Sequence, residues 1–151
     1  MAVKFTPGAV LKVPAGADDF AYGVMLSEFP FMAFYDKKTT FDEGGKASEP
    51  PMFIVLVAQV AYSKGGWGKA VRKLPIDALP PIPRMFWQDP MNKYDCKIVE
   101  PDDRRLTATP ADCVGLEPEA IWAAEHIESR IADTYAGRPN IYAESLRVKI
   151  P

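Results

Sequence analysis

The stretch nearest to a ready-made chemical motif is YSKGGWGKAVRKLPI, which runs from Tyr62 to Ile76. Its glycines surround a tryptophan and a lysine follows, a composition that could hold a phosphate. A phosphate-binding P-loop needs two glycines flanking four residues, then Lys-Ser or Lys-Thr, and then a helix. Here Lys69 is followed by Ala70, and a strand-like run ends at Pro75. The pattern therefore predicts a glycine hairpin turn with Trp67 packed on a sheet, and no nucleotide site.

The histidine and cysteine content offers little to a metal or a nucleophile. The chain has one histidine, His126, and two cysteines, Cys96 and Cys113, which do not form a CxxC pair. A metal site needs several ligands at suitable spacing, and a catalytic cysteine needs a basic partner. We therefore expect a structural histidine, two free packed thiols, no metal and no cofactor.

Carboxylate pairs leave two interpretations open. Asp102 and Asp103 fall in a turn, whereas Glu125 and Glu128 lie one helical turn apart and could share a face. Either pair could serve acid–base chemistry, although solvated charge is the usual reason for such groupings. A hydrolase with a dispersed carboxylate site would show an Asp or Glu with a raised pKa in a cleft.

A more specific interpretation is an acidic surface that binds a basic protein. Residues 1–75 carry nine Lys and Arg against seven Asp and Glu, whereas residues 76–151 carry nine against thirteen. This bias disfavours direct nucleic-acid binding, which needs a basic patch. The predicted partner-binding residues are Asp112, Glu125, Glu128 and Asp133. Reversing Glu125 and Glu128 to lysine should weaken binding and leave the fold intact.

The elements that must position these residues are mostly strands. Aromatic and β-branched residues crowd four early segments and two later ones, which we expect to be strands: 9–14, 20–29, 31–36, 52–62, 93–100 and 104–108. The fifteen prolines argue against a helical bundle. Five of them lie in residues 73–90, which should run extended as a strap over the sheet.

The clearest helix signal lies near the C-terminal end. Pro118 suits a first turn and Gly137 a stop, so we expect a helix from Pro118 to Ala136. Thr109 before a proline predicts a capped helical turn just upstream. The expected fold is a single α+β domain over residues 1–151. A bent, mostly antiparallel sheet of roughly six to eight strands, which could close into a barrel, would carry this helix.

Neither export nor membrane insertion is indicated. The N-terminal residues lack a continuous apolar stretch of signal-peptide length, and the most apolar run, residues 52–62, is about half of a membrane span. We therefore expect a cytoplasmic protein.

The order of short motifs resembles a known family. PGAVLKVP, AYGVML and AFYD come first, then GGWGK, FWQD and RRLTATPADCVGLEPEAIWAAEHIESRI, spanning about Phe5 to Gly137. Together they resemble the Imm26 immunity proteins of bacterial polymorphic toxin systems. The resemblance implies a bacterial, non-enzymatic toxin inhibitor that binds a cognate toxin domain, such as a nuclease, by protein–protein interaction. It transfers no catalytic residue, and Trp67, Trp87 and Trp122 look like fold determinants.

The sequence also allows a different class of function, namely ligand binding. Phe86, Trp87 and Tyr94 could form an aromatic platform for a small molecule or a glycan. An aromatic pocket open to solvent would favour this alternative, whereas a filled barrel interior would not.

Overall fold

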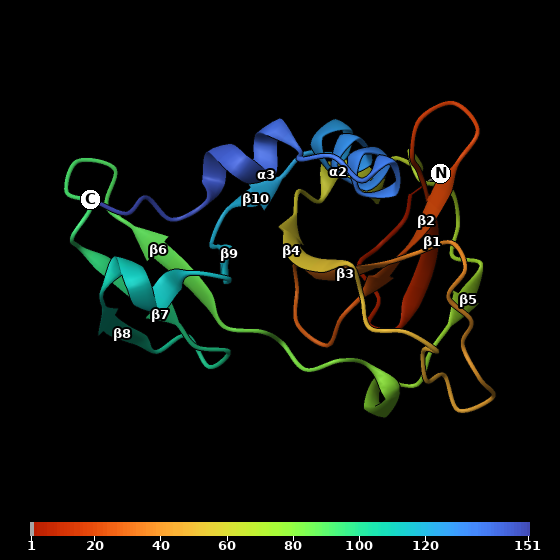
Figure 1. The fold of residues 1–151 in the computed structure, drawn as a ribbon. Coiled ribbons are helices and arrows are strands. Elements are labelled where there is room, and N and C mark those ends of the chain that lie inside the picture. The colour runs from red at the N-terminus through yellow and green to blue at the C-terminus, as the bar shows by residue number, and fades with distance from the viewer. Residues whose placement is uncertain (1) are drawn as a thin grey trace. The chain divides into compact units, whose positions relative to one another are not determined.

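Ten strands form two separate sheets in the computed structural model, which describes residues 2–151 (Figure 1). The chain divides into two compact units, and each is described by itself. The first contains the residues up to Ile82 together with Ile121–Asn140, and the second contains Pro83–Ala120 and Ile141–Pro151. A single domain can contain two such units, so the expectation of one domain stays a prediction.

The first unit is built on a six-stranded sheet in the order β10-β4-β3-β2-β1-β5. The neighbouring strands are antiparallel except β10, which runs parallel to β4. The strands are β1 (Ala9–Pro14), β2 (Phe20–Met25), β3 (Phe31–Tyr35), β4 (Phe53–Val57), β5 (Arg72–Lys73) and β10 (Ile121–Trp122).

Both faces of this sheet are buried. On one face Val10, Val24 and Ala33 lie opposite one another and join a cluster with Leu26, Tyr35 and Leu74. On the other face, Gly23 lies opposite Phe34. A Cβ at Gly23 would come within 3.1 Å of the Phe34 ring. A larger residue there would fit tightly, because the aromatic ring packs directly on the backbone and would have to shift by a few tenths of an ångström.

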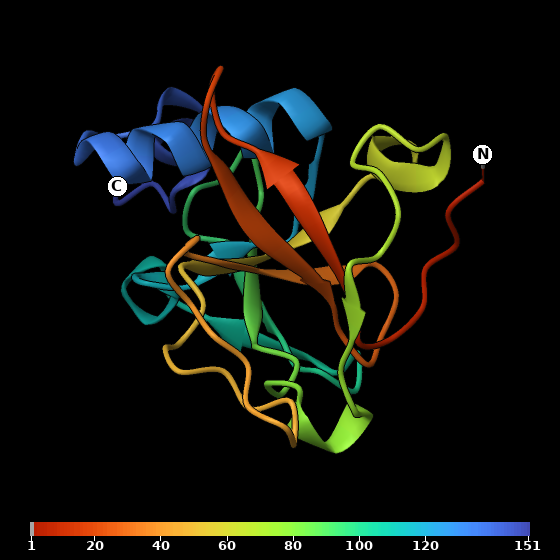
Figure 2. The same cartoon turned by 90° about the vertical axis from the view of Figure 1, so that its right-hand side faces the viewer.

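Two helices complete the first unit. The short α1 (Val60–Ser63) follows β4, and α2 (Ala124–Ala136) follows β10. Figure 2 shows α2 side-on beside the hairpin of β1 and β2. Ile127 and Ile131 of α2 are fully buried, as a helix with one apolar face requires. A 3₁₀ turn, η1 (Ile76–Ala78), interrupts the proline-rich segment.

The second unit is built on a four-stranded sheet in the order β8-β7-β6-β9. Its elements are β6 (Met85–Gln88), β7 (Cys96–Val99), β8 (Arg105–Ala108), η2 (Pro110–Cys113), β9 (Glu117–Pro118) and α3 (Ile141–Leu146). The core is small, and its buried members are Phe86, Cys96, Ile98 and Cys113.

The structure confirms the α+β class and many of the expected elements. Strands occupy all six predicted segments, and Thr109 caps the predicted helical turn in a reciprocal capping box with Asp112. Gly137 ends α2 in the left-handed conformation, with φ of 69°. No helix among residues 2–151 is long and apolar enough to span a membrane.

The predictions of a single sheet and of a closed barrel were wrong. The strands form two open sheets, and β10 and β5 are the unpaired edges of the larger one. The expected start of the helix that ends at Ala136 was also wrong, because α2 begins at Ala124 and not at Pro118. The residues before it pair with strands instead: Pro118 with Phe86 of β6, and Trp122 with Val57 of β4. Long-range backbone pairing has overridden local helix signals there.

Two further segments differ from expectation. The apolar run 52–62 is a strand only to Val57, after which the chain turns into α1 and buries Tyr62. The proline-rich segment is a strap only in part: Leu79 and Ile82 pack on the first sheet's core cluster, as expected. However, Met85–Gln88 is an inner strand of the second sheet, where it pairs with β7 and β9.

Candidate functional site

The four carboxylates predicted to bind a partner do not all lie in one unit. Asp112 belongs to the second unit, whereas Glu125, Glu128 and Asp133 lie on α2 in the first. Asp112 closes the capping box: its Oδ2 accepts a hydrogen bond of 2.9 Å from the Thr109 backbone N–H. This backbone hydrogen bond is the main reason why the pKa of Asp112 is lowered.

Glu128 holds the indole of Trp67. The Trp67 Nε1–H donates to Glu128 Oε2 at 3.0 Å, and Trp67 is only 4% exposed. The same indole lies edge-on to Phe34, with ring centroids 6.1 Å apart. The prediction that Trp67 packs on the sheet is therefore confirmed. Glu128 satisfies a buried donor, so we now expect its reversal to lysine to lower stability, which an intact fold after reversal would contradict.

Asp133 secures the end of α2. Its carboxylate accepts from Arg138 Nε at 2.6 Å and from the amide of the buried Asn140 at 2.9 Å. The hydrogen bond from Arg138 is the main cause that lowers the pKa of Asp133. Both carboxylate oxygens are therefore engaged within the first unit.

Glu125 is the carboxylate of α2 that faces solvent. It lies in the first turn, is exposed, and forms no side-chain hydrogen bond or ion pair within residues 2–151. At 100° per residue, Glu128 and Asp133 point about 140° apart around the helix, with Glu125 between them. The three carboxylates of α2 are thus spread around the helix, and Glu125 is the one that is exposed to solvent.

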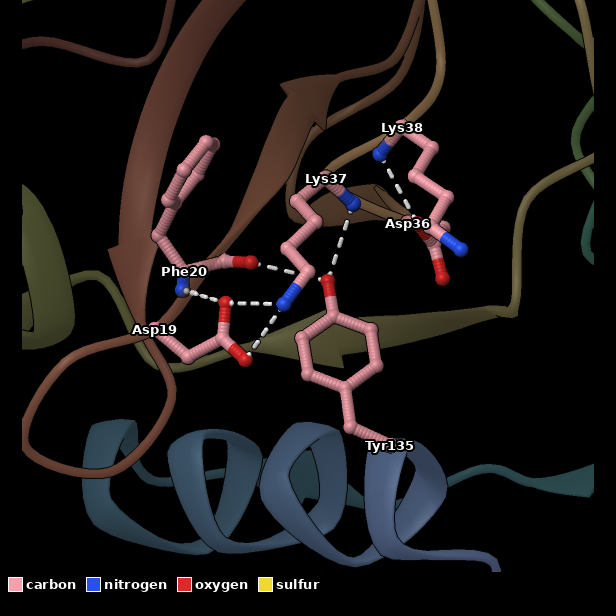
Figure 3. Close-up of polar contacts among 6 residues, drawn as sticks. All are labelled: Asp19, Phe20, Asp36, Lys37, Lys38 and Tyr135. Atoms are coloured by element: carbon pink, nitrogen blue, oxygen red, sulfur yellow. Dashed lines mark hydrogen bonds and ion pairs between the residues drawn. The ribbon is translucent and has the colours of Figure 1, made fainter.

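Tyr135 links α2 to the start of β2 and to the loop after β3 (Figure 3). Its hydroxyl donates to the Phe20 carbonyl at 2.8 Å and accepts from the Lys37 backbone N–H at 2.9 Å. The Lys37 ammonium meets both carboxylate oxygens of Asp19 at 2.7 and 2.8 Å. Burial raises the pKa of Tyr135 to about 12, so the phenol stays protonated at neutral pH. The cluster fastens the helix to the sheet.

Acidic side chains show no sign of a general acid with a raised pKa. Where the pKa of a carboxyl group among residues 2–151 departs clearly from its ordinary value, it is lowered: Asp19, Asp102, Asp112 and Asp133. Each of these carboxylates accepts hydrogen bonds, mainly from Lys37, Arg104, Thr109 and Arg138 respectively. These carboxylates are ionised and accept hydrogen bonds from neighbouring donors. A general acid would instead need a raised pKa, so that it keeps a proton to donate.

The cysteines and the histidine also have structural surroundings. Cys96 and Cys113 are buried free thiols of the second core, and burial raises the pKa of Cys113 to about 11. A thiol of this kind is a poor nucleophile, as expected. His126 is half-buried on α2. Within residues 2–151 no group of three or more His, Cys, Asp or Glu side chains could hold a metal ion.

The second unit contains a pocket of about 490 Å³, which is within the size range of small-molecule sites. Its walls come from β6 and the following loop, from the residues after β9, and from the chain's C-terminal tail: Phe86–Pro90, Lys93, Pro118–Ala120, Ser145–Arg147 and Lys149. Figure 1 shows this tail running from α3 back to β6.

The pocket exists because β9 pairs with only half of β6. The ladder joins Met85 to Glu117 and Phe86 to Pro118, and the Glu119 N–H then donates to the Phe86 carbonyl at 2.8 Å. Beyond that point Trp87 and Gln88 have no partner strand on this side. An open strand edge next to a half-buried indole is therefore left in the second sheet.

The predicted aromatic platform is assembled only in part. Phe86 is buried and Trp87 is half-buried, and both line the pocket, whereas Tyr94 is 73% exposed and does not. Sequence reasoning found the indole but missed the polar residues around it, namely Gln88, Lys93 and the C-terminal tail. The FWQD motif was the one available signal, because it places a glutamine next to the tryptophan.

Comparisons with models of protein families, with curated proteins and with solved structures find no match for this chain.

Proposed function

We propose that this protein is an immunity protein that binds a cognate antibacterial toxin domain and neutralises it by forming a stoichiometric complex in the cytoplasm of the producing cell. The observation that carries the proposal is the order of short motifs, from PGAVLKVP to the residues of α2, which resembles the Imm26 family. The proposal requires no catalysis, cofactor or metal of this chain.

The places that these motifs take in the fold support the proposal. Trp67 and Trp122 are 4% and 3% exposed, so they are core residues of the first unit rather than parts of a reactive site. Such motifs specify a scaffold, and the partner-binding residues would then lie on its surface. The resemblance therefore concerns the scaffold, as expected for an inhibitor that acts by binding.

Among the predicted partner-binding residues, Glu125 is the best placed to meet a basic toxin. It is exposed on α2, whereas Glu128, Asp133 and Asp112 accept hydrogen bonds within the chain. A free carboxylate at the rim of an interface increases the association rate with a basic partner, and salt screens this effect.

The test begins with the tagged chain in its native host, with mass spectrometry of proteins that remain bound after a stringent wash. We expect one protein that is encoded next to this chain and is lethal when expressed alone. Co-expression of this chain should restore growth. If the neighbouring toxin kills cells equally with and without this chain, the immunity proposal is wrong.

A charge reversal then tests the surface. Glu125→Lys should weaken the complex at low salt and reduce its salt dependence. Glu43→Lys, in the exposed loop before β4, is the matched control because it changes the same charge away from α2. Equal binding by both variants would exclude Glu125 from the interface without affecting the immunity function.

The pocket beside Trp87 favours a second candidate function, a small-molecule-binding module. Its volume, its open edge and its half-buried indole are what such a site requires. A saturable change in the Trp87 indole N–H resonance on addition of a small ligand would support this function. Absence of any such change over a panel of aromatic and sugar ligands would remove it.

A further inference from the structure

We propose that the pocket beside Trp87 binds a small organic carboxylate with a flat apolar body, such as an aromatic acid. This inference rests on the second candidate function above and names the ligand class of the same site. It depends on one arrangement: Gln88 holds a lysine-bearing loop and the basic C-terminal tail next to the indole and the open edge of β6.

The carboxylates that line the pocket are already occupied. Glu119 accepts from Arg105 through both oxygens at 2.8 Å. Asp89 Oδ1 accepts from the backbone N–H groups of Met91 at 2.7 Å and of Asn92 at 3.3 Å, which shapes its own loop. The charge of Glu119 is therefore balanced by Arg105, whereas Asp89 accepts backbone N–H groups and keeps its negative charge.

The cationic side chains of the pocket have fewer partners within the chain. Arg147 meets Glu144 at 3.2 Å in a largely exposed pair, and the Lys149 Nζ donates to the Ser145 carbonyl at 2.8 Å. Lys93 forms no ion pair within the part of the chain that the structure describes, residues 2–151. The balance of available charge is positive, so the pocket suits an anion.

Gln88 brings these cations to the same pocket. Its Nε2 donates to the Lys93 carbonyl at 2.9 Å and to the Lys149 carbonyl at 2.8 Å, while its Oε1 accepts from the Lys149 N–H at 2.8 Å. A side-chain amide thus pairs with the tail as a neighbouring strand would. The loop and the tail are separated by more than 50 residues, and this one side chain fixes both.

The open edge of β6 adds a neutral donor. The Phe86 carbonyl bonds toward β9, and the Asp89 N–H bonds to the Asp95 carbonyl on the opposite side. Because successive residues of a strand direct their backbone groups to alternate sides, the Gln88 N–H points to the open side with Phe86. A carboxylate accepts hydrogen bonds from both backbone N–H groups and ammonium groups.

The remaining walls suit a flat apolar body. Trp87 is half-buried, and Pro90, Pro118, Ala120 and Leu146 supply further apolar surface. An indole offers a face on which another ring can stack, while a carboxylate on that ring would reach Lys93. The ligand class follows from this combination of a ring surface with an anion-binding rim.

The probes are benzoate, benzamide and benzylammonium, which share one ring and differ in charge. Each is titrated into the ¹⁵N-labelled full chain, and the indole N–H resonances of its three tryptophans are followed. Trp87→Phe identifies the resonance of interest. We expect benzoate to shift the Trp87 signal saturably and to bind about tenfold more tightly than benzamide, with benzylammonium weakest.

Variants then test the named residues. Lys93→Ala should reduce the preference for benzoate over benzamide and leave benzamide binding unchanged. Gln88→Leu should reduce the same preference by releasing the loop and the tail. Arg104→Ala is the matched control, because it removes an exposed cation of the second unit that does not line the pocket. Spectra of all variants show whether the sheet is still folded.

Three results would overturn the inference, and they differ in what they say about the binding function of the pocket. If benzamide and benzylammonium bind as well as benzoate, the carboxylate preference is wrong although the pocket still binds small molecules. If none of the three probes shifts the Trp87 signal, the ligand class is wrong; the wider panel of aromatic and sugar ligands then decides the binding function itself. A benzoate preference that survives Lys93→Ala and Gln88→Leu would also overturn it.

Discussion

The two units use their sheets in different ways. In the first unit, side chains cover both faces of a six-stranded sheet, and its largest fully buried side chains include Phe34, Tyr62 and Leu11. In the second unit, a four-stranded sheet has a small core around Phe86 and Ile98, and β9 covers only half of one strand edge. The first sheet is filled, whereas the second leaves room beside Trp87.

This difference shows where a binding site can form in such a chain. Filling a sheet on both faces increases the buried apolar area, and with it the stability, but leaves no space for a ligand. A strand edge whose partner stops early exposes backbone groups and a concave surface at the same time. The first unit is thus suited to act as a scaffold, and its own pocket, of about 400 Å³, is lined by surface residues such as Lys4, Lys69 and Lys73. In the second unit the pocket lies at the strand edge itself.

The largest expected effect is on the core of the first unit. Phe34 is fully buried and stacks on Phe53 with ring centroids 5.1 Å apart. Phe34→Ala should lower the free energy of unfolding by about 3–5 kcal/mol, because it leaves a large cavity. Ile98→Ala in the smaller core should cost less, about 2 kcal/mol. Denaturant titrations of both variants measure the difference, and equal losses would contradict it.

A smaller effect is expected for the buried indole of the first unit. Glu128→Ala removes the acceptor of the Trp67 N–H and should cost about 2 kcal/mol, because a charged acceptor is lost and a buried donor is left unpaired. Glu125→Ala, three residues earlier on the exposed side, should change stability by a few tenths of a kcal/mol. Thermal and denaturant unfolding compare the two. Similar losses would mean that the indole bond contributes little.

Loss of the Thr109–Asp112 capping box in the second unit should lower stability by a smaller amount still. Thr109→Ala breaks the capping box with Asp112 and should cost about 1 kcal/mol. Hydrogen exchange of the η2 amides should increase in this variant, and exchange in β2 and β3 serves as the internal reference. Unchanged exchange in η2 would show that the cap does not hold the turn.

The smallest expected effect is a loss of folding stability at low pH through Asp133. The pKa of Asp133 is lowered in the folded chain, so its contribution to stability is present above its ordinary value of 3.8 and is lost as the pH falls below it. Wild type should therefore lose more stability than Asp133→Asn between about pH 5 and about pH 3. Denaturant midpoints across this range measure the loss, with the exposed Asp18→Asn as control. Parallel pH profiles would contradict the prediction.

Several elements could be predicted because their signals are local. Aromatic and β-branched residues between turns indicated β1 to β3, and a threonine before a proline indicated the η2 cap. The helix end at Gly137 was also predictable, because glycine adopts the left-handed conformation without strain. The start of α2 was not, because Trp122 pairs with Val57, a residue far away in the sequence.

The candidate site shows the same limit. The indole of Trp87 could be picked out as a candidate, since the neighbouring aromatic residues Phe86 and Trp87 are visible in the sequence. The Gln88 contact with Lys149 could not, because it joins residues 61 positions apart. The partner carboxylates illustrate the converse: Glu128 and Asp133 looked like surface charge, yet their hydrogen bonds to Trp67 and Arg138 lie within the fold.

The sequence by itself determined the α+β class, most strand positions, the buried tryptophans Trp67 and Trp122, and the burial of two free thiols. Those features follow from burial preference and from conformational rules that act over a few residues. Only the tertiary structure decided that there are two sheets, that α2 begins at Ala124, and that β6 has an open half. The physical reason is that backbone hydrogen bonds between distant segments outweigh local propensities of a few tenths of a kcal/mol per residue.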